Sequence, residues 1–324
     1  MATTVRHLQF NRSLFIALAC FTGIIGIVHH FLFPIPDHIQ WIFFSVIIII
    51  TGIPHGALDH QVAKQSSNLN NQVFSAKKFH TKYLSSMLLY GIVWYVFPTV
   101  SFYLFLLISA FHFGETDLPI DSPKVPLLGV LLQVSYGLLI LFIILFVHID
   151  TVLPIIQKIN IFSPGLINYL QGEYIALLAI SASFGFFILT LIASYIIHKK
   201  NIVDIRHLFK LVIFVFISAL ILPLPLCFII YFGLWHSISS LENIRQHLSK
   251  SKDEGLTWKS LMIQCIPLTA ISLVGLFSVI FFLDLTNNIN LVIMGLFIGI
   301  SILTLPHQEV MSKMYLLIRK KSAN

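Results

Sequence analysis

The stretch IQWIFFSVIIIITGIPHGALD, residues 39–59, decides the fold class. It is a nearly continuous apolar run, long enough to cross the hydrocarbon core of a bilayer, which requires about 20 apolar residues. Pro54 and His55 lie inside this run, well before its acidic end at Asp59. An ionisable side chain within a membrane helix is costly and is retained for function. The stretch therefore predicts a membrane helix and makes His55 a candidate functional residue.

The rest of the chain has the same apolar character. Of its 324 residues, 57% are hydrophobic and 10% are charged, and the mean hydropathy is +0.91. Soluble proteins carry about 25% charged residues. We therefore expect an all-α, polytopic integral membrane helix bundle that forms a single membrane domain over residues 1–324. The net charge is +7, and the basic residues lie in short loops between apolar runs. Basic residues in such loops orient membrane helices, so the charge argues against nucleic acid as a partner.

Apolar runs bounded by charges or by Pro, Gly and Asn predict about ten transmembrane segments, with eight as the lower bound. They cover residues 13–33, 39–59, 82–97, 99–114, 125–148, 174–197, 208–222, 224–246, 260–283 and 291–311. Prolines alone divide the third from the fourth and the seventh from the eighth, so either pair could be one broken segment. If the N-terminus is cytoplasmic, the lysines and arginines in loops and at segment ends lie on the cytoplasmic side, and only Lys158 lies on the opposite side of the membrane. We predict cytoplasmic termini and a multi-pass protein of the cell (inner) membrane.

Four histidines lie deep inside four different predicted segments: His55, His112, His236 and His307. Counted at about 1.5 Å per residue, all four come to roughly 18 to 24 Å from the outer ends of their helices. A single intramembrane histidine is usually a hydrogen-bonded helix contact. Four histidines at one depth favour a metal site, because neutral imidazole is a common ligand of iron, copper and zinc, and helix bundles build metal centres from facing helices.

Two carboxylates follow these histidines closely. Asp59 lies four residues after His55, and Glu115 lies three residues after the histidine of its own segment. Each would share a helical face with that histidine if the helix continues. We expect them to accept the second N–H of the ligating histidines and so to orient the rings. Asp117 and Asp121 are expected in a solvated acidic loop.

The motifs around these histidines resemble one known family. They are GIPHGALDH (52–60), FHFGETD (111–117), WHS (235–237) and LPH (305–307). In this order they resemble the blocks of the Brp/Blh family, the bacteriorhodopsin-related-protein-like membrane β-carotene 15,15′-dioxygenases of bacteria and archaea. The resemblance spans residues 40 to 310, and the nine-residue block is its most specific part.

The resemblance implies Fe(2+) held by histidines, with β-carotene and O2 as substrates. Cleavage at the central 15,15′ double bond would give two molecules of all-trans-retinal, and a rhodopsin is a candidate receiver of that product. The family pattern has a second histidine four positions after the one matching His236, where this chain has Ser240. His55, His112 and His236 are therefore taken as catalytic iron ligands with His307 as the fourth, and His60 is held in reserve.

Two other functions use the same features. A membrane transporter would have discontinuous, proline-broken helices of the kind predicted here. A haem-binding membrane protein would use intramembrane histidines as axial ligands. The HExxH motif of metalloproteases is missing from the sequence.

Overall fold

A computed structural model describes residues 12–118, 120, 126–159, 162–198, 204–249, 255–284 and 289–323, and all regular structure in these ranges is helical. Predicted cytoplasmic positions such as Arg6, Lys124 and Lys199 lie outside the described residues, as does Asp121. The chain divides into two compact units. The first comprises residues 1–52, 110–153 and 168–240, and the second comprises residues 53–109, 154–167 and 241–324. The expectation of one membrane domain stays a prediction.

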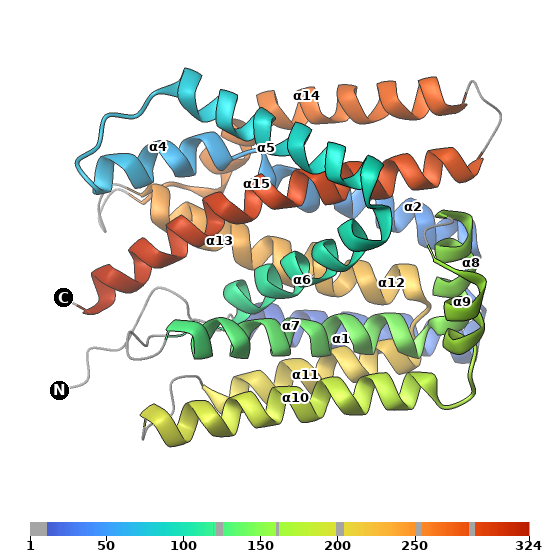
Figure 1. The fold of residues 1–324 in the computed structure, drawn as a ribbon. Coiled ribbons are helices and arrows are strands. Elements are labelled where there is room, and N and C mark those ends of the chain that lie inside the picture. Colours follow the sequence, from blue (N-terminus) through green and yellow to red (C-terminus); the bar gives the residue numbers. More distant parts are fainter. Residues whose placement is uncertain are drawn as a thin grey trace. The chain divides into compact units, whose positions relative to one another are not determined.

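The first unit is organised around one long apolar helix. Its helices are α1 (Arg12–Ile27), η1 (Val28–Leu32), α2 (Asp37–Ile47), η2 (Ile48–Gly52), the end of α6 (Pro98–Asp117), α7 (Pro126–Val147), α10 (Ile175–His198), α11 (Ile205–Ile221), α12 (Leu224–Ile229) and η3 (Ile230–His236). Figure 1 shows α7 beside α10 and α11, on which it packs. Leu132, Tyr136 and Ile140 of α7 are fully buried. A hydrogen bond of 2.7 Å between the hydroxyls of Ser135 and Thr190 joins α7 to α10.

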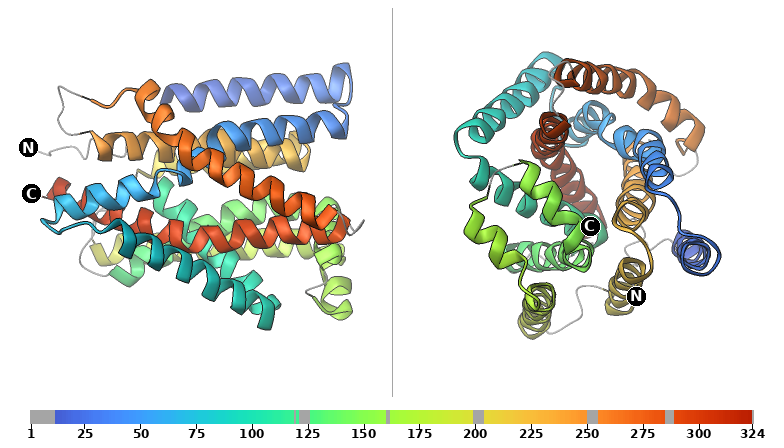
Figure 2. Two further views of the ribbon diagram at one scale, coloured as in Figure 1. Left: turned by 90° about the horizontal axis from the view of Figure 1, so that it is seen from above. Right: turned by 90° about the vertical axis from the view of Figure 1, so that its right-hand side faces the viewer.

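The second unit is organised around the longest helix of the described chain. Its helices are α3 (Ile53–Gly56), α4 (Asp59–Leu69), α5 (Ala76–Val96), most of α6, parts of α8 (Ile149–Ile159), α9 (Pro164–Leu170) and α13 (Ser237–Leu248), α14 (Trp258–Asp284) and α15 (Ile289–Ala323). α15 packs on α4, α5 and α14, and Figure 2 shows α14 and α15 side by side in orange and red. Trp94 donates its indole N–H to the Ser301 hydroxyl at 2.9 Å, which joins α5 to α15.

Eight helices of the described chain are long and apolar enough to cross a membrane. They are Arg12–Leu32, Asp37–Leu69, Pro98–Asp117, Pro126–Val147, Ile175–His198, Leu224–Leu248, Trp258–Phe282 and Met294–Arg319. The predicted class, an all-α multi-pass membrane protein of eight to ten segments, is confirmed. The other two predicted segments are helices as well, α5 and α11, but they are not among these eight. Which side of the membrane holds the termini stays a prediction.

Prolines and π-helical turns interrupt the long helices. α5 ends at Val96 and α6 begins at Pro98, and α11 ends at Ile221 before α12 begins at Leu224, so both proline sites divide two helices. Three π-helical segments, η1, η2 and η3, lie within the described chain. π-Helical turns are rare and occur frequently at functional sites. η2 ends directly before α3, the helix of His55, and η3 ends at His236.

Candidate metal centre

Two of the predicted ligands meet inside the first unit. His112 lies on α6 and His236 ends η3, and their Nε2 atoms are 3.1 Å apart. The ring centroids are 4.8 Å apart and the ring planes are inclined by 73°. His236 has no exposed surface and His112 is 3% exposed. The structure therefore brings these two predicted ligands together, and their role in binding a metal stays a prediction.

Aromatic side chains enclose this pair. The Phe113 ring lies edge-on to the His236 ring, with centroids 4.7 Å apart. The Phe232 ring stacks on the His236 ring with centroids 5.8 Å apart and planes inclined by 15°. Because phenyl rings offer no hydrogen bonds, they shield the imidazoles from water and keep the local dielectric low.

Asp117 differs from its prediction. We expected a solvated carboxylate, but it accepts three hydrogen bonds within the first unit. Its Oδ2 accepts from the Tyr136 hydroxyl at 3.0 Å and from the Tyr231 hydroxyl at 2.9 Å, and its Oδ1 accepts from the Trp235 indole at 3.1 Å. The expectation was wrong because the donors come from α7 and η3, which lie far from Asp117 in the sequence.

The other two predicted ligands meet inside the second unit. The rings of His55 on α3 and His307 on α15 have centroids 5.0 Å apart and planes inclined by 73°. They are 6% and 7% exposed. The Nδ1 of His307 lies 2.8 Å from Oδ1 of Asp59, whose Oδ2 accepts a hydrogen bond from the Tyr83 hydroxyl at 2.9 Å. A carboxylate that accepts from Nδ1 fixes the tautomer and leaves the Nε2 lone pair for a metal.

Asp59 thus bonds to a different histidine from the one expected. The expectation required one continuous helix from His55 to Asp59. Instead α3 ends at Gly56 and α4 begins at Asp59, so His55 and Asp59 lie on two separate helices. Pro54 lacks a backbone N–H, which favours the irregular π-helical turn η2 directly before α3.

The remaining predicted residues have separate positions. Glu115 is buried on α6, and Ser240, four positions after His236, is buried on α13. His60, the reserve ligand, lies on α4 with its Nδ1 3.1 Å from Nε2 of His80 on α5. The two rings are stacked, with planes inclined by 15°. The partly exposed His60 is therefore engaged in a contact of its own.

The spacing of the donor atoms fits one divalent metal ion. Two imidazole nitrogens that bind one ion at about 2.1 Å and at right angles lie roughly 3 Å apart, whereas opposite axial ligands would lie about 4 Å apart. The separation of 3.1 Å between the Nε2 atoms of His112 and His236 suits adjacent positions on an ion rather than the two faces of a haem. His307 carries the carboxylate partner that metal-binding histidines usually have.

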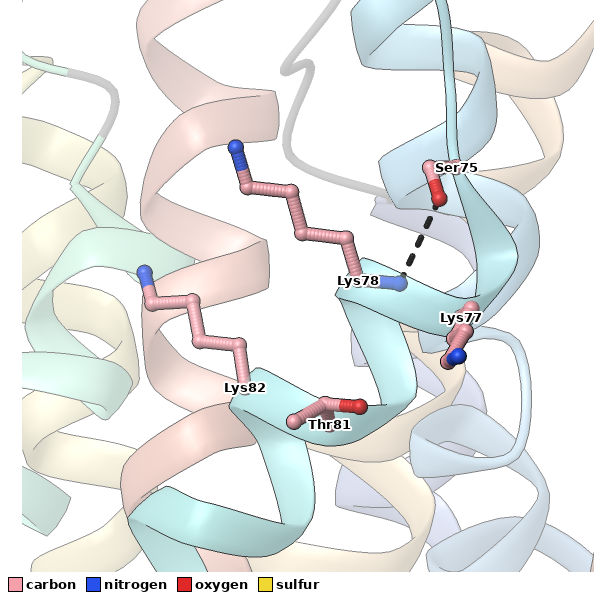
Figure 3. A pocket seen from close by; sticks show the side chains of 5 residues that line it. All are labelled: Ser75, Lys77, Lys78, Thr81 and Lys82. Carbon is pink, nitrogen blue, oxygen red and sulfur yellow. Dashed lines mark hydrogen bonds between the residues drawn. The ribbon is translucent and has the colours of Figure 1, made fainter.

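A surface hollow elsewhere has different chemistry. Figure 3 shows it at the start of α5, lined by Ser75, Lys77, Lys78, Thr81 and Lys82. Ser75 caps the helix by accepting a hydrogen bond from the Lys78 amide at 3.4 Å, which satisfies one of the open N–H groups of the first turn. No histidine lines this hollow, so it is not the candidate metal centre.

A family model described as beta-carotene 15,15′-dioxygenase matches residues 46–315. The chain belongs to the beta-carotene 15,15′-dioxygenase family. The resemblance predicted from the motifs is therefore confirmed, and the matched region contains both histidine pairs. The chain is also similar to the beta-carotene 15,15′-dioxygenase of the uncultured marine bacterium 66A03, with 30% identity over 86 residues. This alignment covers 26% of the chain and 31% of the length of that relative. No solved structure matches the chain.

Proposed function

We propose that this protein cleaves β-carotene at the central 15,15′ double bond with O2 and releases two molecules of all-trans-retinal. Its family supports the type of reaction. The observation that carries the proposal is the buried His112–His236 pair, whose Nε2 atoms face each other at 3.1 Å within the matched region. We propose the cell (inner) membrane as its location, with both termini cytoplasmic.

The iron site in this proposal uses four histidines. His112 and His236 provide two ligands, and His55 and His307 provide the other two. Four neutral imidazoles would leave the full charge of Fe(2+) uncompensated, which favours binding of an electron-rich partner. When bound, the iron would supply an open position for O2 beside the polyene.

The chain's own side chains prepare the site without acid–base chemistry. Asp59 holds the proton at Nδ1 of His307, so that the Nε2 lone pair faces outward from the carboxylate. Phe113 and Phe232 cover the His236 ring and exclude water from it. The reaction breaks one carbon–carbon double bond and puts one oxygen atom into each aldehyde, so no proton has to be supplied or removed. A protein nucleophile is not required either.

The substrate is as apolar as the interior of the bilayer. A rigid polyene without hydrogen-bonding groups dissolves in lipid rather than water, so an enzyme for it gains from a position within the membrane. The eight long apolar helices of the described chain satisfy this requirement. Delivery of the retinal to a rhodopsin stays a prediction from the family resemblance.

The proposal is tested in cells that produce β-carotene. Expression of the chain should convert the carotenoid into retinal, detected by extraction and chromatography, and the cells should lose their orange colour. His55→Ala, His112→Ala and His236→Ala should each abolish the conversion at similar protein levels. His38→Ala is the matched control, because its side chain is exposed. Wild-type cells without retinal would contradict the function, and unchanged conversion in one histidine variant would remove that residue from the ligand set.

A further inference from the structure

We infer that Asp117 is a positioning residue that sets the register of η3 against the end of α6 and thereby brings His236 to His112. The inference rests on the proposed function, because it concerns the metal site of that proposal. It assigns a role to a residue that was not predicted to bind the metal. All contacts that carry it lie within the first unit.

Asp117 and its donors lie close in sequence to the two histidines that they position. Asp117 is five residues after His112 on α6, and Trp235 directly precedes His236 in η3. The bond from the Trp235 indole to Oδ1 therefore spans the same two elements as the contact between the histidines. A change in the separation or rotation of these elements would alter both contacts together.

The second donor from η3 makes the register specific. Tyr231 lies one turn before Trp235, and its hydroxyl reaches Oδ2 while the indole reaches Oδ1. A shift of a helix by one residue rotates each side chain by roughly a quarter of a turn. Such a rotation would remove both donors from Asp117 and carry His236 away from His112. One carboxyl group with two η3 donors therefore selects a single rotational setting of this π-helical segment.

The third donor joins the same group to α7. The Tyr136 hydroxyl shares Oδ2 with Tyr231, and Tyr136 is fully buried. The two tyrosine hydroxyls and the Trp235 indole each donate to the Asp117 carboxylate. A polar network whose hydrogen-bonding groups are satisfied in this way favours one unique arrangement of its helices. The end of α6 is thereby held to both α7 and η3.

Two substitutions of Asp117 separate hydrogen bonding from charge. Asp117→Ala removes all three acceptor bonds. Asp117→Asn keeps an oxygen that can accept from the Trp235 indole, which can only donate, and offers an amide group to the tyrosine hydroxyls, which can also accept. If the geometry of hydrogen bonding positions η3, the asparagine variant should resemble the wild type.

The test measures metal binding by the purified full chain. Metal-free protein in detergent is titrated with Co²⁺, followed by visible absorption, and the unfolding temperature of the metal-free form is recorded for each variant. Asp117→Ala should weaken Co²⁺ binding by on the order of ten-fold or more, the range for groups that orient metal ligands. Asp117→Asn should stay within roughly three-fold of the wild type, since it keeps hydrogen-bonding capacity.

Milder variants keep the test decisive if Asp117→Ala fails to fold. Trp235→Phe and Tyr231→Phe each remove one donor and keep an aromatic ring, and each should weaken Co²⁺ binding several-fold. Trp41→Phe and Tyr195→Phe are the matched controls, because both side chains are exposed in the same unit. Wild-type Co²⁺ affinity in these two donor variants, or in Asp117→Ala, would overturn the inference. So would an asparagine variant as weak as the alanine variant, because charge would then be the requirement.

The outcomes distinguish this inference from the proposed function. If the wild type binds Co²⁺ and Asp117→Ala does not, but cells make no retinal, the proposed reaction fails and the positioning role stands. If the wild type makes retinal and Asp117→Ala binds Co²⁺ equally well, the positioning role fails alone. A wild type that binds no Co²⁺ overturns the metal centre and this inference together.

Discussion

His307 and Asp59 are joined by a contact of 2.8 Å between Nδ1 and Oδ1, although 248 positions separate them in the chain. The same carboxylate accepts a hydrogen bond from the Tyr83 hydroxyl. Asp59 therefore connects α15, α4 and α5 within the second unit. The carboxylate orients the His307 ring. The ability of His307 to bind a metal therefore depends on a residue that is distant in the sequence.

Removing the Asp59 carboxylate should weaken iron binding. We expect Asp59→Ala to reduce Fe(2+) affinity by about 10- to 100-fold, because His307 loses the acceptor that fixes its tautomer. Asp59→Asn should fall between Asp59→Ala and the wild type, since an amide oxygen accepts from Nδ1 but carries no charge. Metal titration of the purified chain measures the effect, with the exposed Asp150→Ala as control. Equal affinities for all four proteins would contradict this role of Asp59.

The fourth ligand can be identified by comparing two histidines. His307→Ala should lower both iron content and retinal formation to the level of His112→Ala. His60→Ala should retain iron, because the structure engages His60 in a partly exposed pair with His80 instead. Iron per protein, measured after purification, decides between them. Loss of iron in the His60 variant with retention in the His307 variant would reverse the assignment.

Close packing of α6 on α7 should make Gly114 intolerant of a side chain. A Cβ at Gly114 would overlap the backbone of Gln133, and one at Gly137 would overlap the backbone of Ala110. We expect Gly114→Ala to destabilise the protein by at least about 1–3 kcal/mol, the usual range for overpacking, and to lower iron content because α6 carries His112.

Gly185→Ala provides the matched control for this substitution. Gly185 lies on α10 in the same unit, and a Cβ there would meet no atom within 4 Å. Thermal unfolding in detergent should show a lower midpoint for Gly114→Ala and an unchanged one for Gly185→Ala. Identical midpoints would show that α6 can move away from α7 at little cost.

Removal of iron should stop the reaction reversibly. Treating the purified chain with a strong Fe(2+) chelator should abolish retinal formation, and adding Fe(2+) should restore it. Zn²⁺ should bind the same imidazoles without restoring turnover, because it has no redox chemistry. Activity that survives complete chelation, with metal content measured on the same sample, would exclude iron as the cofactor.

Some features of the site follow directly from local sequence. The apolar run of residues 39–59 predicted a membrane helix, and the histidines within such runs indicated where the chemistry lies. Hydrophobicity and the cost of burying an ionisable group are properties of a short segment, so these features could be predicted without a structure. The nine-residue block 52–60 indicated the family for the same reason.

Tertiary structure alone decided which polar groups meet. Sequence spacing paired Asp59 with His55, but the break after Gly56 and the approach of α15 pair it with His307. Asp117 was expected in solvent, yet donors from α7 and η3 enclose its carboxyl group. Hydrogen-bond partners depend on how helices break, rotate and approach one another. These relations involve residues far apart in the chain, so the pattern of any single segment could not predict them.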